Sequence, residues 1–419
     1  MNKKIIVIGA GPAGMMAAVK AAENGAEVTV LEKMGRAGKK MLITGKGRCN
    51  ITNASEVPEL ISHVMGNGAF LNSSMRAFDN RDVIRFFEEA GVPTKVERGN
   101  RVFPASDRAA DVVDAMLAKL QELGVHVVTE TAAKEILVED GAAVGARSAT
   151  GEEWRGDAVI LAVGGASYPG TGSAGDGYAM AKRLGHSIAR ILPALVPLET
   201  EEEWVKEAQG LSLRNVRAAL FADGKKEAEL FGEMMFTHFG VTGPIVLSLS
   251  RRAAEVLEDG AFVELVLNLK PALTPETLDA RVQRDFLKYA RKRLKNGLQD
   301  LLPGKMIAPV MDAAYLDPDK PVHEVTQEER ARLVDALRHL SLTVTKTRPL
   351  SEAIVTAGGV SVKEINPKTM ESKLVPGLYF AGEVVDVDAC TGGYNLQAAF
   401  SMGAAAGCWS VWNEKNRWC

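Results

Sequence analysis

The chain has 419 residues, which is longer than one ordinary domain, so we expect two or three domains. Its net charge of -3 and its pI near 6.2 exclude a protein that is basic overall, and no apolar run reaches the about 18 residues of a membrane-spanning helix. The four cysteines form no C-x-x-C pair and no H-E-x-x-H occurs, so we predict no disulfide framework, no metal and a reducing, cytoplasmic location.

The N-terminus predicts a strand, a glycine turn and a helix. The apolar run 5–8 is typical of a parallel strand that is buried on both faces. Gly9, Gly11 and Gly14 follow in G-x-G-x-x-G spacing. The first glycine permits a tight turn, the second lets the backbone approach a pyrophosphate, and the third lets helix and strand pack closely. This stretch therefore predicts a dinucleotide-binding unit whose helix N-terminus meets the phosphates.

The next segments continue this unit. A second strand, 26–31, ends in Glu32, about 20 residues after the glycines, where a carboxylate can accept the ribose hydroxyls. In the segment GKGRCNITN (45–53) we expect Lys46 and Arg48 to supply positive charge and Asn50 to supply hydrogen bonds. Helices are predicted at 79–90 and at 108–123, the latter capped by Ser106 or Asp107, and strands at 125–129 and 133–139.

Two later glycine-rich segments distinguish a flavin from a nicotinamide. A buried strand, 159–163, enters Gly164 and Gly165. Residues 377–407 contain a strand, Gly382 and Glu383, a glycine pair, and a helix that begins near Asn395. A transient nicotinamide needs only the N-terminal site, whereas an extended flavin dinucleotide needs both. The sequence therefore favours FAD, with the last helix directing N–H groups at the ring edge where negative charge develops on reduction.

The middle of the chain has a different pattern. Short strands and turns over 211–270 suggest a barrel-like insert, and Thr274 with Pro275 predicts the start of a helix. We assign 1–190 and 345–419 to a split FAD-binding domain, 191–272 to the inserted β-barrel-like domain, and 273–344 to its helical subdomain. A basic stripe on one helical face suggests a polyanion contact, although a solvated face explains it as well. Its residues are Arg281, Arg284, Lys288, Arg291, Lys292 and Lys295.

Together these segments resemble the glutathione-reductase-type FAD fold and, more narrowly, the BaiN/RdsA-like (YhiN-type) family of bacterial NAD(P)/FAD-dependent oxidoreductases. The resemblance rests on residues 45–53, 101–113, 162–186, 232–244, 355–360 and 377–397. It implies a mixed α/β chain with a Rossmann-like FAD domain and an inserted barrel-plus-helix region. It also implies reduction of activated C=C bonds, in substrates from steroid-like enones to a uridine of large ribosomal RNA. Ala389 and Cys390 depart from the family pattern, so Cys390 receives no role.

The candidate residues divide into cofactor contacts and proton donors. Those expected to contact FAD are Gly9, Gly11, Pro12, Ala13, Gly14, Glu32, Lys33, Arg36, Gly38, Lys40, Gly45, Gly47, Arg48, Cys49, Asn50, Ala133, Gly164, Gly165, Gly382, Glu383, Gly392, Gly393, Tyr394, Asn395 and Leu396. His238, in FTHFGVTGP, and Cys49 are candidate proton donors. Each has a structural alternative, as a core histidine and as a small buried residue.

We therefore expect an FAD-dependent oxidoreductase that passes hydride from the flavin to a conjugated C=C and is re-reduced by NAD(P)H. No second glycine fingerprint marks a nicotinamide domain. A dihydrouridine synthase acting on ribosomal RNA, an amine or aminoacetone oxidase, and a non-catalytic FAD-binding redox sensor remain alternatives.

Overall fold

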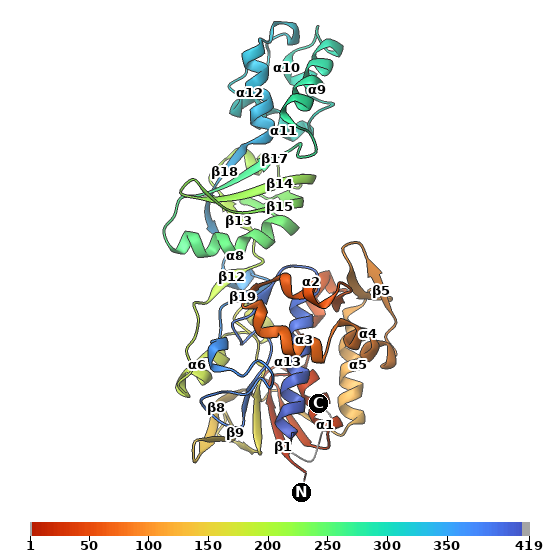
Figure 1. Ribbon diagram of the computed structural model, residues 1–419, viewed down its shortest axis with the longest axis vertical. Helices are drawn as coiled ribbons and strands as arrows, with labels where there is room; N and C mark the ends of the chain where they lie inside the picture. The colour runs from red at the N-terminus through yellow and green to blue at the C-terminus, as the bar shows by residue number, and fades with distance from the viewer. Residues whose placement is uncertain (1, 413–419) are drawn as a thin grey trace. The chain divides into compact units, whose positions relative to one another are not determined.

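The computed structural model describes residues 2–412, which form two compact units (Figure 1). One unit contains the described residues up to Leu192 and from Leu350 onward, and the other is Pro193–Pro349. The last barrel strand, β18 (Leu340–Thr347), begins inside the range that the sequence analysis gives to the helical subdomain. The four-part division of the chain itself stays a proposal, and Cys419 lies outside the described residues.

A parallel sheet forms the centre of the first unit. Its strand order is β20 (Leu378–Phe380), β11 (Ala158–Leu161), β1 (Lys4–Ile8), β2 (Glu27–Leu31) and β7 (His126–Val128). All four neighbouring pairs are parallel, with Ile6 opposite both Val159 and Thr29. The apolar run 5–8 is buried on both faces, as its sequence predicts. The strand that precedes the first glycine turn and the strand that precedes Gly382 therefore end at the same edge of one sheet.

Helices α1 (Pro12–Glu23) and α13 (Tyr394–Val411) pack directly on each other. A Cβ atom at Gly403 would lie 2.3 Å from the carbonyl oxygen of Ala13, and one at Gly407 would lie 2.2 Å from that of Ala17. From the first contact to the second, the position advances by four residues on each helix. The helices therefore run parallel, and their N-termini point to the same end. Helix α13 extends about 12 Å further in that direction, because eight more residues precede its contact with α1.

Smaller elements surround this pair. Helix α5 packs on α1, and further short helices and two- or three-stranded sheets complete the unit. The helices are α2 (Val57–Ser62), α3 (Asn72–Ala77), α4 (Asn80–Glu89), α5 (Ala109–Glu122) and α6 (Asp176–Arg183). The sheets contain β3 (Thr52–Asn53), β6 (Arg101–Pro104) and β5 (Thr94–Glu97); β10 (Glu153–Arg155), β9 (Ala142–Ser148) and β8 (Ala133–Glu139); and β21 (Asp388–Ala389) with β4 (Val64–Gly66).

The inserted unit contains the predicted barrel, which is closed and has six strands. In order around the barrel they are β13 (Leu198–Thr200), β16 (Gly240–Thr242), β15 (Lys225–Phe236), β14 (Ser212–Ala222), β17 (Val263–Asn268) and β18. Helix α8 (Pro244–Glu258) packs on the barrel. The helices that follow β17 are α9 (Pro275–Lys288), α10 (Leu294–Gly297), α11 (Gly304–Ala313) and α12 (Gln327–Arg338), and α12 contacts both α9 and α11.

Helix caps confirm some predictions and correct one. Asp79 caps α4 with a reciprocal capping box, and Thr274 caps α9 with Pro275 as its first residue. The cap predicted for α5 is wrong: α5 begins after Arg108, which makes no side-chain cap bond. Asp107 adopts a left-handed conformation (φ 58°), and its carboxylate binds Arg48 and Lys95 instead of the helix.

The basic stripe does not form a single helical face. Helix α9 ends at Lys288, so Arg291, Lys292 and Lys295 lie beyond it. Ion pairs also neutralise part of the stripe: Arg281 with Asp285, Lys288 with Asp300, and Lys295 with Asp319. The sequence pattern predicted one continuous helix because it contains no glycine or proline at the break, and the pairing carboxylates come from segments that a helical wheel leaves out.

The contact between α1 and α13 gives a direct prediction. Replacing Gly407 with Ala places a methyl group against the Ala17 carbonyl, where the helices have no room for it. We expect the free energy of unfolding to fall by about 1–3 kcal/mol, because overpacking forces backbones apart. Urea denaturation measures this. Gly170→Ala is the control, since a Cβ there meets open space, and an equal effect in both variants contradicts the prediction.

Candidate functional site

The three glycines of the N-terminal turn have different surroundings. A Cβ at Gly9 would lie 2.6 Å from the carbonyl oxygen of Ala162, and one at Gly14 would lie 1.9 Å from that of Gly9. A Cβ at Gly11 would meet no atom within 4 Å. Gly11 also caps α1 without a side-chain hydrogen bond to the first turn. The first and third glycines therefore serve chain packing, whereas the second faces open space beside the N–H groups of a helix N-terminus.

Glu32 lies at the end of β2, beside this turn. Its carboxylate accepts hydrogen bonds from the backbone N–H groups of Ala10 (2.9 Å) and Met34 (2.8 Å). These bonds fix its orientation, and each oxygen keeps a second lone pair for a ligand hydroxyl. The next cations are already paired, Lys33 with Asp176 and Arg36 with Asp114. Of these side chains, Glu32 is the one whose position suits ribose hydroxyls.

A partly buried ion pair joins three distant parts of the chain. The Lys40 ammonium lies 2.7 Å from one Glu383 oxygen, and the other oxygen accepts hydrogen bonds from the Ser167 hydroxyl and the Thr356 N–H. Burial raises the pKa of the Glu383 carboxyl, but Lys40 and these donors outweigh it and hold the pKa below its ordinary value. A Cβ at Gly165 would lie 2.5 Å from the Thr356 hydroxyl oxygen. The contacts of Lys40, Gly165 and Glu383 thus hold these segments of the chain together. The sequence analysis did not predict this structural role.

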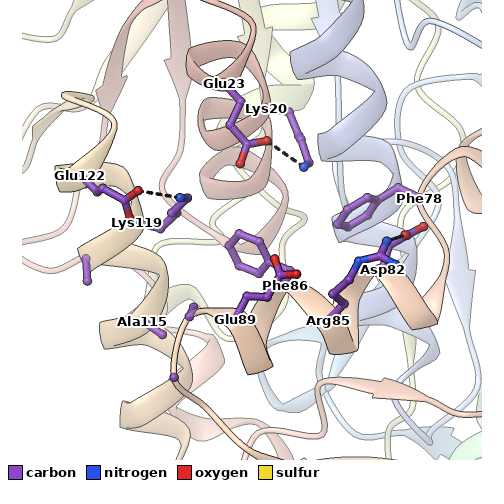
Figure 2. A pocket seen from close by; sticks show the side chains of 13 residues that line it. Lys20, Glu23, Phe78, Asp82, Arg85, Phe86, Glu89, Ala115, Lys119 and Glu122 are labelled. Atoms are coloured by element: carbon purple, nitrogen blue, oxygen red, sulfur yellow. Dashed lines mark hydrogen bonds and ion pairs between the residues drawn. The ribbon is translucent and has the colours of Figure 1, made fainter. Parts of the chain in front are cut away.

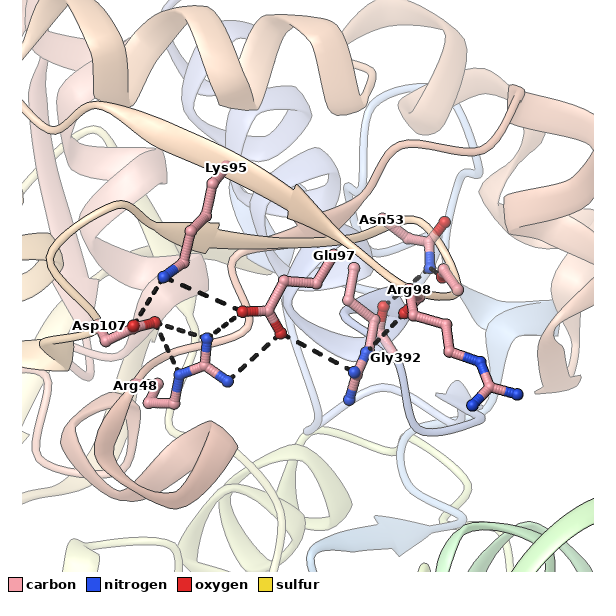
Figure 3. Close-up of polar contacts among 9 residues, drawn as sticks. Arg48, Asn53, Lys95, Glu97, Arg98, Asp107 and Gly392 are labelled. Atoms are coloured by element: carbon pink, nitrogen blue, oxygen red, sulfur yellow. Dashed lines mark hydrogen bonds and ion pairs between the residues drawn. The ribbon is translucent and has the colours of Figure 1, made fainter. Parts of the chain in front are cut away.

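Arg48 is also engaged by protein groups (Figure 3). Its guanidinium binds the carboxylates of Glu97 and Asp107, and it lies over the Phe103 ring, 4.1 Å from the centroid. Lys95 contacts the same two carboxylates. Arg48 lowers the pKa of Glu97, and Lys95 and Arg48 lower that of Asp107. We predicted that the positive charge of Arg48 would meet a phosphate or a reduced flavin. Instead, its ion pairs hold the 45–53 segment against the β5–β6 hairpin.

The segment around Cys49 has an unusual backbone. Gly45, Lys46 and Cys49 all have φ between 57° and 59°. The Cys49 side chain is fully buried, and burial raises the pKa of its thiol to about 12. The Asn50 side-chain oxygen is buried and makes no hydrogen bond within the described residues. An unsatisfied buried acceptor costs about 1–3 kcal/mol, which suggests a missing partner.

The N-terminus of α13 is held by two asparagines. Asn53 Nδ2 donates to the carbonyl oxygens of Gly99 and Gly392, both at 3.0 Å, which joins the hairpin tip to the glycine pair (Figure 3). Asn395 bonds the N–H and carbonyl of Ala389, so its side chain orders the preceding loop. A Cβ at Gly393 would lie 2.3 Å from the carbonyl oxygen of Thr52. The backbone N–H groups of the first turn of α13, at Tyr394, Asn395 and Leu396, are the groups suited to a ligand.

The remaining predicted contacts have structural partners. A Cβ atom at Gly38 would lie 2.7 Å from the Val113 side chain, and one at Gly164 would lie 2.7 Å from the Ser173 hydroxyl. A Cβ atom at Gly382 would lie 2.8 Å from the Ala13 side chain. The Gly382 contact brings the second glycine segment against the start of α1. Ala133 is the first residue of β8 and pairs with Ser148. The sequence analysis did not predict the structural bonds that five residues form at this site, because their partners are distant in the sequence. These residues are Asn53, Glu97, Asp107, Ser167 and Thr356.

His238 lies in the inserted unit, on the tight turn between β15 and β16. The side chain is exposed and its ring contacts that of Phe239 edge-on, with 4.9 Å between centroids. The alternative of a core histidine is therefore wrong. The nearby glycines serve the barrel: a Cβ at Gly240 would lie 2.1 Å from the Leu198 carbonyl oxygen, and one at Gly243 would lie 2.8 Å from Met234 Cα. They are thus no indication of a ligand.

A pocket of about 500 Å³ opens between the end of α1, α4 and α5 (Figure 2). It combines two phenylalanine rings with ion pairs such as Lys20–Glu23 and Lys119–Glu122. It lies at the opposite end of α1 from Gly11, so it is separate from the glycine turn. Across residues 2–412 we find no helix long and apolar enough to cross a membrane, and no cluster of three acidic, histidine or cysteine side chains placed to hold a metal.

These features fit FAD. The open space at Gly11, the oriented Glu32 carboxylate and the unsatisfied Asn50 oxygen are left for a ligand by the chain itself. The parallel helices place a second N-terminus about 12 Å beyond the first, as an extended dinucleotide requires. A nicotinamide that binds only at the first helix leaves the second unexplained.

We expect Gly11→Val to fold normally and to lose FAD, because its side chain enters space that no protein atom occupies. Far-UV circular dichroism and the visible absorbance of the purified protein measure the two effects. Gly9→Val is the contrasting variant, since its side chain collides with backbone and should destabilise the fold. Full FAD occupancy in Gly11→Val contradicts this placement of the phosphates.

Removing Lys40 should expose the cost of a partly buried carboxylate that has lost its counter-ion. We expect Lys40→Met to lower the free energy of unfolding by about 3 kcal/mol at neutral pH. Because the pKa of Glu383 is depressed in the folded protein, the pair stabilises above the unfolded pKa of about 4.3, and this contribution disappears as the pH falls. Urea titrations from pH 7 to pH 3, a range that extends below the unfolded pKa, measure the difference, and adding Glu383→Gln should restore part of the loss. A difference that stays constant with pH contradicts the assignment.

Comparison with known proteins agrees with this geometry. The family model of the HI0933-like protein Rossmann domain matches residues 3–409. A 3-dehydro-bile acid delta(4,6)-reductase of Clostridium scindens is 32% identical over 97% of this chain and 98% of its own length. A ribosomal RNA dihydrouridine synthase of Haemophilus influenzae is 30% identical over 96% of both chains.

Among solved structures, the 3-ketosteroid delta1-dehydrogenase of Sterolibacterium denitrificans superposes with a TM-score of 0.53, covering 98% of this chain and all of the other, at 12% identity. That likeness shows the fold alone. The family match and the two full-length relatives establish the family: the chain belongs to the HI0933-like Rossmann family of FAD-binding oxidoreductases.

Proposed function

We propose that this protein reduces an activated C=C bond with hydride from FAD that NAD(P)H has reduced. The observation that carries the proposal is the shared chemistry of the two full-length relatives. A delta(4,6)-reductase saturates carbon–carbon double bonds, and dihydrouridine is uridine saturated at one such bond. The two substrates are otherwise unlike, so the bond that is reduced is what the relatives have in common.

The chain's part in this reaction is to bind and orient. Gly11 and the first turn of α1, with Pro12 and Ala13, would hold the diphosphate, and Glu32 the ribose. The first turn of α13 would direct N–H groups at the ring edge that becomes negative on reduction. When bound, FAD supplies the hydride that the C=C accepts. One carbon then needs a proton, which a positioned side chain of the protein would donate.

Of the two candidate donors, His238 suits the task better. It is exposed on a tight turn, and an imidazole is a common general acid in enzymes. Cys49 is fully buried, and its raised pKa of about 12 makes its thiol a poor acid at neutral pH. We therefore assign the proton to His238 and packing to Cys49.

Ribosomal RNA is the second candidate substrate, favoured because a relative that matches nearly the whole chain is a ribosomal RNA dihydrouridine synthase. Of the basic stripe, Arg284, Arg291 and Lys292 form no ion pair with the described residues and would be the groups left for phosphate. A cytoplasmic location belongs to the same proposal, since NAD(P)H and ribosomes are found there.

Two measurements separate the proposal from its alternatives. Purified protein is mixed anaerobically with NADH or NADPH and then with a steroid enone, and flavin absorbance is followed through bleaching and recovery. Ribosomal RNA from cells with and without the gene is analysed for dihydrouridine. Bleaching without recovery by any acceptor supports a redox sensor, and peroxide formed from an amine supports an oxidase. Loss of dihydrouridine in the deletion strain identifies RNA as the substrate.

The proton donor gives a separate prediction. His238→Ala should keep FAD and its reduction by NAD(P)H, while the re-oxidation of flavin by the acceptor slows by about 10²–10⁴-fold, as expected for loss of a general acid. Stopped-flow absorbance separates the two half-reactions. Cys49→Ala is the matched comparison and should change re-oxidation by less than about threefold. If Cys49→Ala slows re-oxidation and His238→Ala does not, the proton is assigned to Cys49.

A further inference from the structure

The 45–53 segment contains one polar atom that the chain leaves without a role. The side-chain oxygen of Asn50 is buried and has no hydrogen-bond partner among the described residues. Its neighbours in the segment are satisfied: Arg48 binds two carboxylates, Thr52 Oγ1 bonds Gln397 Oε1 (2.5 Å), and Asn53 bonds two carbonyls. Buried acceptors in folded proteins nearly always have a donor, and residues 2–412 supply none to the Asn50 oxygen, so the geometry leaves that oxygen for a donor from a ligand.

The backbone holds Asn50 in place at some cost. Cys49, directly before it, has φ 59°, a conformation that side-chain-bearing residues rarely adopt. A Cβ at Gly45 would lie 3.1 Å from the Asn50 nitrogen and 3.3 Å from the Phe103 ring. The glycine thus lets the loop fold back tightly over Asn50. Among the described residues, no group of this loop donates a hydrogen bond to the Asn50 side-chain oxygen.

The location of Asn50 indicates what the donor is. Two residues later, the Thr52 side chain bonds Gln397 on α13, and a Cβ at Gly393 would lie 2.3 Å from the Thr52 carbonyl oxygen. Asn50 therefore lies two residues from the segment that contacts the N-terminus of α13, where the proposed function places the isoalloxazine. That ring carries N–H at N3 in both redox states and gains N–H at N5 on reduction, so it offers donors to an acceptor.

We propose that Asn50 Oδ1 accepts a hydrogen bond from an N–H of the isoalloxazine. The proposal rests on the proposed function only for the presence of FAD, because it involves no substrate. A bond to N3–H stabilises bound FAD in both redox states. A bond to N5–H stabilises the reduced form alone and raises the reduction potential.

The test compares Asn50→Leu, which removes the acceptor at similar volume, with Ile51→Val, which disturbs the same segment without removing a polar atom. Apoprotein is reconstituted with FAD labelled with ¹⁵N in its ring, and N3 and N5 are observed by NMR in both redox states. We expect one of these resonances to move upfield in Asn50→Leu and to stay in place in Ile51→Val. Loss of one neutral hydrogen bond should weaken FAD binding, or lower the reduced-to-oxidised ratio, by about fivefold.

For N5 that ratio corresponds to a fall of about 20 mV in the two-electron potential. Asn50→Asp covers the case in which the leucine variant does not fold: its carboxylate keeps the acceptor, so binding should be retained while the added negative charge lowers the potential. Unchanged N3 and N5 resonances in Asn50→Leu overturn the proposal, even if FAD binds less tightly. A variant that alters only the KM of a uridine substrate overturns it too. Wild-type protein that binds FAD but reduces no C=C contradicts the proposed function and leaves this test intact.

Discussion

The flavin-binding unit depends on the direct backbone contact between α1 and α13. Gly403 and Gly407 allow the two helices to approach until the carbonyl oxygens of Ala13 and Ala17 occupy the space of a side chain. The contact fixes the helices parallel and sets the offset between their N-termini. Two sets of N–H groups, from segments nearly 400 residues apart, thereby face the same end of the sheet. A dinucleotide in extended form can bind both, which a single Rossmann turn cannot offer.

Most charged side chains near this end serve the chain itself. Lys40 and Glu383 fasten three segments together, and Arg48 holds the β5–β6 hairpin through Glu97 and Asp107. Since these charges neutralise each other, the groups left for a ligand are mainly backbone N–H groups, the oriented Glu32 carboxylate and the Asn50 oxygen. Such fixed dipoles need little reorganisation when charge develops, which suits a flavin that alternates between neutral and anionic states.

The two relatives act on unlike substrates. A bile acid derivative and ribosomal RNA differ in size and shape, yet each relative's name describes saturation of a double bond. The exposed turn that carries His238 belongs to the inserted barrel unit.

The sequence by itself determined the Rossmann sheet, the glycine turn, the presence of a barrel-like insert and the FAD assignment, because these follow from local periodicity and from glycines whose spacing has a fixed steric meaning. Only the tertiary structure decided which polar residues are free to act. Arg48 and Lys40 are paired with carboxylates 49 and 343 residues away, Cys49 is in the core, and α9 ends at Lys288 before the basic stripe is complete. Such pairings depend on how distant segments meet, and the identity of a charged residue does not reveal whether its partner is a ligand or the protein.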